Sequence, residues 1–292
     1  MFKSGFVSII GRPNSGKSTL LNQLLGEKVS IVSDKPQTTR ENILGILTFK
    51  EGQVVFTDTP GIHKPGYELN RRMMKTVYDS LEGTDLLLLL VDASTAFGSG
   101  DQYVIDLLKE RGLPTFLLLN KIDLIRKENL LPLIASYAEK YPFIEVVPIS
   151  ALKKDNLDLL ISLILKQLPE GSPHFPEEQF TDRHERFLVS EIVREKVLAN
   201  TRDELPYSTT VRITRFDESQ PHVILLNCDI FVERESQKKI VIGSQGQMLK
   251  QIGTKARADI ESLLGRRVYL ELYVRVKPKW RDDPRFLDSV RN

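Results

Sequence analysis

The chain has 292 residues, of which 41% are hydrophobic and 27% are charged, and this composition excludes a largely disordered protein. The longest apolar run, Leu86–Val91, is far shorter than the roughly 20 residues that cross a bilayer, so it is predicted to be a buried strand. The N-terminus carries no pattern of a secretory leader, and we expect a cytosolic protein.

The formal net charge of +2 is distributed unevenly along the chain. Residues 1–170 contain 20 Lys and Arg against 20 Asp and Glu, whereas residues 238–281 contain 11 against 3, a local charge of +8. A basic segment of this kind is a candidate surface for a polyanion. The asymmetry predicts two separate functions, one in each half of the chain.

Cysteine and histidine are too sparse to build a covalent or metal framework. The single cysteine cannot form an intramolecular disulfide, and the four histidines lie far apart in the sequence, so we expect no structural zinc. Cys228 lies within an apolar strand pattern and is predicted to be a small buried or half-buried residue.

The first part of the chain alternates apolar runs with amphipathic stretches, which is typical of a doubly wound α/β domain with a mostly parallel sheet. The short spacing between the second and third runs predicts one antiparallel hairpin. The apolar runs are Val7–Ile10, Ile43–Phe49, Val54–Thr57, Leu86–Val91, Phe116–Leu119 and Ile144–Val147, and the helical stretches include Tyr103–Arg111, Leu130–Lys140 and Leu157–Leu168.

A glycine-rich stretch after the first run has the spacing of a phosphate-binding P-loop. Its glycines let the backbone curl, so that successive N–H groups and the N-terminus of the next helix converge on phosphates. Lys17 adds a positive charge, and Ser18 adds a hydroxyl for Mg²⁺. A plain strand-to-helix turn is the alternative, which the full spacing disfavours. The predicted phosphate contacts are Gly11, Arg12, Pro13, Asn14, Ser15, Gly16, Lys17, Ser18 and Thr19.

Two further loops are expected to sense the terminal phosphate. The polar loop at 34–40 offers Thr38 and Thr39, of which we favour Thr39 as a Mg²⁺ ligand. Asp58 follows a strand and can hold the metal shell through water, while the Gly61 N–H can meet the γ-phosphate. Loss of that phosphate should release both loops. The predicted metal set is Ser18, Thr39 and Asp58, and Thr59, Pro60, Gly61 and Ile62 complete the predicted nucleotide contacts here.

The stretch Asn120-Lys121-Ile122-Asp123 comes directly after a predicted strand and indicates guanine. A carboxylate can accept hydrogen bonds from the guanine ring N–H and the amino group, and adenine has no matching donors. Asn120 and Lys121 are expected to support the base and the P-loop. A second base contact is expected from Ser150, Ala151 and Leu152, where a backbone N–H can meet the guanine carbonyl.

Proline, glycine and polar residues then interrupt the alternation, which predicts a linker. We predict a first domain at 1–170, a linker at 171–182 and a second domain at 183–292. The second domain has the order α-β-β-α-α-β. Its predicted elements begin with the helix Arg183–Asn200, continue with strands Thr209–Phe216 and His222–Val232 and a helical region that reaches Leu264, and end with the strand Val268–Val276.

A Gly-x-x-Gly turn lies inside this helical region. Neither glycine has a β-carbon, so a nucleic-acid backbone can approach the main-chain N–H groups closely. Each neighbouring cation is a candidate phosphate partner, although any one of them could equally be a solvated surface charge. The predicted RNA contacts are Gly243, Ser244, Gln245, Gly246, Lys250, Lys255, Arg257, Arg266 and Arg267.

With these motifs in order, the chain resembles translation-factor-like GTPases and, more closely, the Era family of the TrmE–Era group, over essentially its whole length. The resemblance implies an α/β P-loop GTPase domain followed by an α+β type II KH domain, with GTP or GDP and Mg²⁺ as ligands. It also implies GTP hydrolysis and binding to the 3′ end of small-subunit ribosomal RNA during assembly of the small ribosomal subunit. We expect the chain to act as a monomer.

Hydrolysis must differ from that of Ras-type enzymes, because Ile62 stands where those carry a water-positioning glutamine. In related GTPases an asparagine at the position of Asn14 helps to bind K⁺, which adds positive charge near the transition state. The catalytic group is expected to comprise Lys17, Thr39, Gly61 and Asn14. The C-terminal segment 276–287 also resembles the family. Its aromatic residues are expected to pack onto the second domain, and stacking on a base is the less favoured alternative.

Two other functions are considered. One is a kinase acting on a small molecule, which the guanine motif disfavours. The other is a GTPase switch that signals through a membrane or cell-cycle partner, with RNA binding secondary. The basic segment could meet anionic lipid and allow peripheral association with the inner face of the cell membrane, which we rank below RNA.

Overall fold

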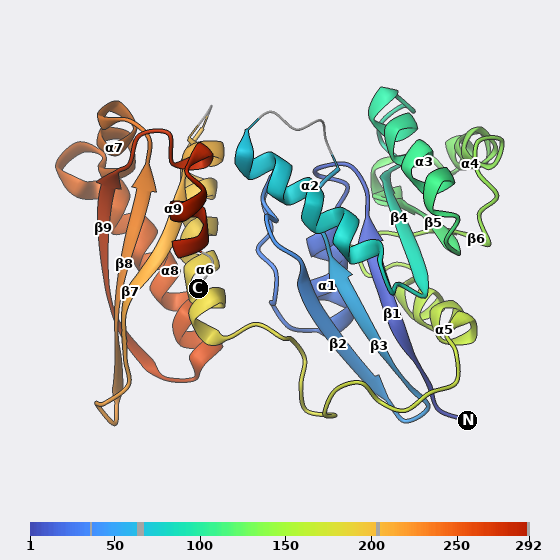
Figure 1. The fold of residues 1–292 in the computed structure, drawn as a ribbon, viewed down its shortest axis with the longest axis horizontal. Coiled ribbons are helices and arrows are strands. Elements are labelled where there is room, and N and C mark those ends of the chain that lie inside the picture. The colour runs from blue at the N-terminus through green and yellow to red at the C-terminus, as the bar shows by residue number, and fades with distance from the viewer. Residues whose placement is uncertain (36, 63–66, 203–204, 291–292) are drawn as a thin grey trace. The chain divides into compact units, whose positions relative to one another are not determined.

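The computed structural model describes residues 1–35, 37–62, 67–202 and 205–290. The chain divides into two compact units, one formed by residues 1–65 and 72–182 and the other by residues 66–71 and 183–292. Each unit has its own sheet and its own hydrophobic core (Figure 1).

The first unit contains a six-stranded sheet in the order β2-β3-β1-β4-β5-β6. Strand β2 runs antiparallel to β3, which confirms the predicted hairpin, and the other neighbouring strands are parallel. The carboxyl ends of parallel strands therefore meet at one edge, where α/β sheets bind ligands. The strands are β1 (Lys3–Ile10), β2 (Ile43–Phe49), β3 (Gly52–Asp58), β4 (Leu86–Asp92), β5 (Thr115–Asn120) and β6 (Glu145–Pro148).

In the described part of the chain, the helices α1 to α5 lie on both faces of this sheet (Figure 1). Strand β4 is buried along its apolar run because helices cover both of its faces, as predicted for Leu86–Val91. Helix α2 is not singled out by the sequence analysis; it presents Met73, Met74 and Val77 to the core. The helices are α1 (Lys17–Leu25), α2 (Glu68–Leu81), α3 (Ser99–Arg111), α4 (Leu130–Ala138) and α5 (Leu157–Gln167), with short 3-10 turns at Ile122–Leu124 and Lys127–Asn129.

The segment after α5 lies along β1, β2 and β3. Fully buried Gln53 accepts hydrogen bonds from the N–H groups of His174 and Phe175 and donates one to the Phe175 carbonyl. At the sheet edge, the Ile46 N–H donates to the Phe180 carbonyl at 3.0 Å. Thr181 Oγ1 also donates to a β2 carbonyl. The sheet thus pairs polar groups of His174, Phe175, Phe180 and Thr181.

The second unit packs helices on one face of a three-stranded sheet, β7-β8-β9. Strands β7 and β8 are antiparallel, and β8 and β9 are parallel. Cys228 on β8 is fully buried in the core beneath the helices, as its sequence pattern predicts. The elements are α6 (Glu185–Asn200), β7 (Thr210–Asp217), β8 (Val223–Val232), α7 (Glu235–Ile242), α8 (Gln247–Leu264), β9 (Arg267–Val276) and α9 (Pro284–Ser289), with short 3-10 turns at Pro206–Ser208, Ser244–Gly246 and Trp280–Asp282.

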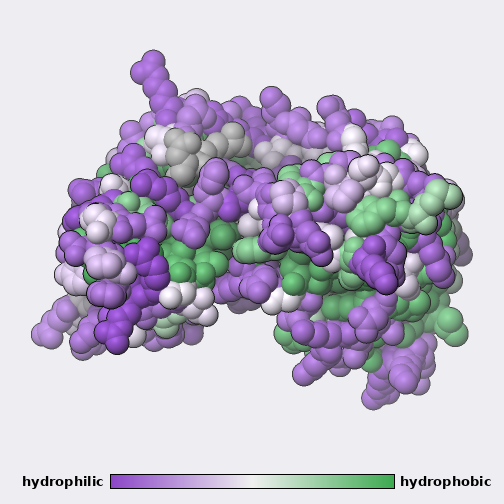
Figure 2. Space-filling view, turned by 90° about the horizontal axis from the view of Figure 1, so that it is seen from below, coloured by the Kyte–Doolittle hydropathy of each residue, from purple (hydrophilic) through white to green (hydrophobic). Residues whose placement is uncertain are grey.

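Most of the surface seen in Figure 2 is hydrophilic, and hydrophobic patches interrupt it. Within the described part of the chain, no helix is both long enough and apolar enough to span a membrane.

Candidate functional site

The P-loop joins β1 to α1 and holds its backbone in a conformation that only glycine adopts easily. Gly16 has φ +102°, and a Cβ placed there would lie 2.3 Å from the side-chain nitrogen of Asn120. That nitrogen donates a hydrogen bond of 2.8 Å to the Ser15 carbonyl. The close approach of Asn120 therefore requires glycine, and it connects the P-loop to the end of β5.

Lys17 is buried at the first position of α1. Its Nζ donates to the carbonyls of Gly11 (3.3 Å) and Arg12 (3.0 Å), so the ammonium group curls back over the loop. Burial lowers the pKa of Lys17 to about 8, and the negative charge of Asp58 opposes that shift. A cation held this way, at the N-terminus of a helix, is suited to an anionic phosphate group.

Three side chains from separate elements converge beside Lys17. Ser18 Oγ lies 2.7 Å from Asp58 Oδ2 and 2.9 Å from Thr39 Oγ1, and Thr39 Oγ1 lies 3.3 Å from the same carboxylate oxygen. Among the residues that the structure describes, Oδ1 of Asp58 has no hydrogen-bond partner. Burial raises the pKa of Asp58, against the charge of Lys17 and the hydrogen bonds.

This group of hydroxyl and carboxylate oxygens fits Mg²⁺, which prefers hard oxygen ligands and retains several waters. The buried carboxylate oxygen without a partner is the observation that supports a cation here. Thr38 instead donates to the Lys35 carbonyl at 2.6 Å, so Thr39 is the threonine that joins the group.

The residues that follow Asp58 lie in two environments, some against the P-loop and others in the protein interior. A Cβ at Gly61 would lie 2.8 Å from the Cα of Pro13, so Gly61 lies directly against the P-loop. Thr59 is fully buried and donates to the Ile9 carbonyl, and Ile62 packs in the core. Asn14 has φ +63°, and its Nδ2 donates to the Asp34 carbonyl at 2.6 Å.

A cavity of about 350 Å³ opens along the P-loop and the loop at 31–39. In the described part of the chain, Thr59, Pro60 and Ile62 are not among the residues that line it. The lining residues are Pro13, Asn14, Gly16, Lys17, Ser18, Thr19, Ile31, Val32, Ser33, Asp34, Lys35, Gln37, Thr38, Thr39, Gly61 and Lys121.

The base-binding motif is organised by Asn120. Its Nδ2 bonds the P-loop, and its Oδ1 accepts from the Ala151 N–H at 2.9 Å. Ser150 Oγ donates to Asp123 Oδ1 at 2.6 Å, which orients the carboxylate expected to read guanine. The structure therefore brings the P-loop, the 120–123 motif and the 150–152 loop together.

Three residues of this region were not found by sequence reasoning. Asp92, at the end of β4, accepts a 2.6 Å hydrogen bond from Lys121 Nζ. Burial alone would raise the pKa of Asp92, but hydrogen bonds from Lys121 and Ser94 outweigh it and lower the pKa. Its position at the carboxyl end of a strand was the available signal. The other two, Asn22 and Ser30, carry no motif, although Ser30 donates a hydrogen bond to Asp58.

Arg12 occupies a predicted phosphate contact, and its guanidinium group points elsewhere. Arg12 Nη1 pairs with Asp101 Oδ2 on α3 at 2.9 Å. The same carboxylate oxygen accepts from the N–H of Gly98 at the start of that helix. The backbone carbonyl of Arg12 contacts Lys17, so its main chain belongs to the P-loop while its side chain connects the loop to α3.

The second unit carries the Gly-x-x-Gly turn between α7 and α8. Gly243 has φ +74°, and a Cβ there would lie 2.6 Å from the Cβ of Met248. Gly246 has φ +77°, and no described atom lies within 4 Å of a Cβ built on it. The first glycine is therefore required by packing, whereas the second is open to an approaching ligand.

A groove of about 360 Å³ lies between α8 and β9. Lys250 and Arg257 lie on it, two turns apart on one face of α8. The remaining predicted cations lie away from it: Lys255 Nζ approaches Asn200 at 3.5 Å, Arg266 bonds Glu218, and Arg267 is exposed on β9. The groove is lined by Leu249, Lys250, Gly253, Thr254, Arg257, Leu270 and Leu272.

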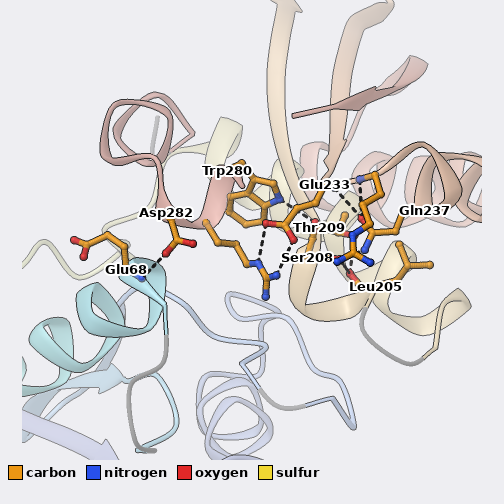
Figure 3. A network of polar contacts seen from close by, with 10 residues as sticks. Glu68, Leu205, Ser208, Thr209, Glu233, Gln237, Trp280 and Asp282 are labelled. Atoms are coloured by element: carbon orange, nitrogen blue, oxygen red, sulfur yellow. Dashed lines mark hydrogen bonds and ion pairs between the residues drawn. The ribbon is translucent and has the colours of Figure 1, made fainter. Parts of the chain in front are cut away.

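The C-terminal segment packs against the second unit, as expected from its aromatic residues. Trp280 is 1% exposed, and its Nε1 donates to the Ser208 carbonyl at 2.9 Å (Figure 3). Gln237 reaches the Ser208 hydroxyl at 3.1 Å and accepts from the N–H of Glu233. Arg281 pairs with the Glu233 carboxylate through two hydrogen bonds. The indole of Trp280 is therefore a core residue and has no free face for a base.

Comparison with known proteins covers both units. A family described as 50S ribosome-binding GTPase matches residues 6–121, and the KH domain family matches residues 204–281. The GTPase Era of Syntrophus aciditrophicus (strain SB) is 51% identical over 288 residues, 98% of this chain and 94% of that protein.

Two solved structures of Era superpose on almost the whole chain, each with 45% identity and covering 99% of both chains. One is a complex with MgGDPNP and nucleotides 1506–1542 of 16S ribosomal RNA, with a TM-score of 0.96. The other is a variant from Aquifex aeolicus bound to GDP·AlF4⁻, with a TM-score of 0.95. The likeness therefore extends across the nucleotide cavity and the groove beside α8.

Proposed function

The chain belongs to the Era family of GTPases, and from this premise we propose that it is a nucleotide-gated RNA-binding switch in assembly of the small ribosomal subunit. Its RNA target is the 3′ end of small-subunit ribosomal RNA. The observation that supports the proposal is that one chain carries both a cavity lined by P-loop residues and Lys121 and a groove lined by Lys250 and Arg257. An Era structure that is 45% identical contains a GTP analogue, Mg²⁺ and 16S ribosomal RNA together.

In the nucleotide cavity, Lys17 and the N-terminus of α1 hold the phosphates, and Asp123 and the Ala151 N–H hold guanine. Ser18, Thr39 and Asp58 hold Mg²⁺. Mg²⁺ held by these residues would neutralise charge that develops on the phosphates during hydrolysis. Thr39 and the N–H of Gly61 contact the γ-phosphate side, so both loops can respond when it leaves.

Water positioning does not use the residue after Gly61, because Ile62 is committed to the core. We assign the transition-state contacts to Lys17, Thr39, Gly61 and Asn14. K⁺ held near Asn14 would place a further positive charge at the phosphates, where electrostatic stabilisation is most effective.

RNA lies along the groove beside α8. The Gly243–Gly246 turn lets the nucleic-acid backbone approach, and Lys250 and Arg257 neutralise phosphates. The apolar floor formed by Leu270 and Leu272 is available to unstacked bases. In this proposal, residues 1–170 form the GTPase domain, residues 171–182 form the linker and residues 183–292 form the KH domain.

The protein acts in the cytoplasm in this proposal, where ribosomal subunits are assembled. Association with the inner face of the cell membrane is the second candidate, and the charge of +8 over residues 238–281 is the feature that favours it.

The test is binding of a labelled oligonucleotide that copies the 3′ end of small-subunit ribosomal RNA, with a GTP analogue, with GDP or without nucleotide. Tighter binding in the GTP state supports the switch, and binding that is independent of nucleotide contradicts it.

Gly246→Asp should abolish binding, because it places a negative charge where the RNA backbone approaches. Gly112→Asp is the matched control, because Gly112 also has a positive φ and open space for a Cβ, and it ends α3 in the other unit. Wild-type binding only to anionic vesicles would favour the membrane alternative.

A further inference from the structure

Ser30 lies outside the nucleotide-binding motifs and contacts the carboxylate at the proposed metal site. Its Oγ donates a hydrogen bond of 2.8 Å to Asp58 Oδ2. Ser30 is 1% exposed and Asp58 is fully buried, so water does not compete for this bond. Hydrogen bonds to a charged group are stronger than hydrogen bonds between neutral groups.

Asn22 holds Ser30 in place from α1. Asn22 Oδ1 accepts from the N–H groups of Val29 and Ser30 at 3.1 and 3.0 Å, and its Nδ2 donates to the Ser30 carbonyl at 2.7 Å. One amide side chain thus satisfies both backbone groups of Ser30, which lies in a segment without regular secondary structure. Because α1 begins with Lys17, the same helix carries the phosphate-binding lysine and fixes Ser30.

The three hydroxyls that reach Asp58 Oδ2 are not equivalent. Ser18 and Thr39 line the nucleotide cavity, whereas Ser30 is not among the lining residues that the structure describes. One carboxylate oxygen has about two lone pairs, so three donors exceed its capacity. Ser18 and Thr39 can therefore turn their oxygens to a metal ion while the Ser30 hydrogen bond remains.

We propose that Ser30, held by Asn22, is a positioning residue that fixes the Asp58 carboxylate for Mg²⁺ in both the GTP and the GDP states. The inference rests on the magnesium site in the proposed function. Thr39 belongs to a loop that departs with the γ-phosphate, whereas Ser30 is attached to α1 and does not depend on that loop. The partner of a metal-site carboxylate typically contributes 10–100-fold to metal affinity.

The test is Ser30→Ala, measured by the affinity for a fluorescent GDP analogue across a Mg²⁺ titration and in EDTA. We expect the Mg²⁺ concentration at half-maximal tightening to rise about 10-fold, with affinity in EDTA unchanged. Ser8→Ala is the matched control, because Ser8 is a fully buried serine on β1 whose hydroxyl contacts Ser80 and Thr84. It should keep the wild-type Mg²⁺ midpoint.

Asn22→Ala tests the same inference without removing the Ser30 hydroxyl. It should also raise the Mg²⁺ concentration at half-maximal tightening. Thermal unfolding of the nucleotide-free variants establishes that they are folded. A wild-type Mg²⁺ midpoint in folded Ser30→Ala overturns the inference, as does an equal loss of affinity with and without Mg²⁺. If the wild-type protein binds GDP equally well in Mg²⁺ and EDTA, the magnesium site itself is wrong.

Discussion

Ser150 donates a hydrogen bond of 2.6 Å to Asp123, so the hydroxyl of one loop orients the carboxylate of another. The backbone beside Ser150 is fixed in turn, because the Ala151 N–H donates to Asn120 at 2.9 Å. The Asp123 carboxylate is thereby connected to the P-loop through the side chain of Asn120. A change at Asp123 or Ser150 should therefore affect base recognition more than phosphate binding, whereas a change at Asn120 should affect both.

Asp123→Asn should weaken GDP binding by about 100-fold, because an amide cannot accept hydrogen bonds from both guanine donors. Xanthine carries an oxygen in place of the guanine amino group, so xanthosine diphosphate should gain affinity for the variant. Competition binding with the two nucleotides measures the exchange. Asp155→Asn, an exposed change in the neighbouring loop, should leave both affinities unchanged, and a variant that still prefers GDP would show that Asp123 does not read the base.

Cations on the groove should contribute more to RNA binding than the others. Lys250→Ala and Arg257→Ala should each weaken binding several-fold and reduce the slope of log affinity against log salt by roughly one phosphate contact. Arg266→Ala should have a smaller effect, because its guanidinium already bonds Glu218 and the Gln220 carbonyl. Titrations at several salt concentrations measure both quantities, and equal effects at Arg266 and Arg257 would contradict an RNA path along α8.

K⁺ should accelerate GTP hydrolysis roughly tenfold over Na⁺ at equal concentration, because a cation near Asn14 would stabilise transition-state charge. Asn14→Asp should change this response. Asn156→Asp is a close control, since Asn156 also has a positive φ, and its amide also donates to a backbone carbonyl. Initial rates in the two salts decide the matter, and equal wild-type rates would exclude the ion from catalysis.

Trp280→Ala should lower the free energy of unfolding of the second unit by about 3–5 kcal/mol, because it empties a fully packed site. Trp280→Phe keeps most of the ring and removes the hydrogen bond to Ser208, so its cost should be about 1–3 kcal/mol. Urea unfolding measures both variants. Tyr269→Ala, at a 58% exposed side chain, should cost much less.

The buried thiol of Cys228 should make the second unit less stable in alkali. Burial raises the pKa of Cys228 to about 12, with a smaller contribution from Asp229, whereas an unfolded cysteine ionises near pH 9. The stability due to this difference is complete below pH 9 and is lost as the pH rises toward 12, at up to about 1.4 kcal/mol per pH unit. Urea unfolding between pH 8 and 10.5 should show this slope, and Cys228→Ala should reduce it. The folded protein should also resist thiol reagents at pH 8.

Strands and motifs could be predicted from the sequence because each depends on neighbouring residues. Leu86–Val91 is apolar throughout and short, which is typical of a strand covered on both faces. Asp58 and Asn120 could be placed because each ends such a strand. The hydrogen bond between Ser30 and Asp58 could not be predicted, because it joins residues 28 positions apart and leaves no periodic signal in the sequence.

The cations of the second unit show a different limit. Composition identifies a basic segment, but it does not distinguish Lys250 from Arg266, because both are cations of that segment. The fold distinguishes them, since Lys250 lines the groove and Arg266 bonds Glu218. Asp92 is an intermediate case, since its place at a strand end was visible while its pairing with Lys121 was not.

The position of Trp280 also affects the order in which the protein is made. Its indole packs against Ser208, which lies 72 residues earlier in the chain. The second unit therefore cannot complete its core until the ribosome has synthesised Trp280 and this residue has left the exit tunnel. During this interval the sheet of β7 and β8 would expose apolar surface to solvent. A nascent chain stalled before Trp280 should therefore recruit chaperones, and one extended beyond the tail should not.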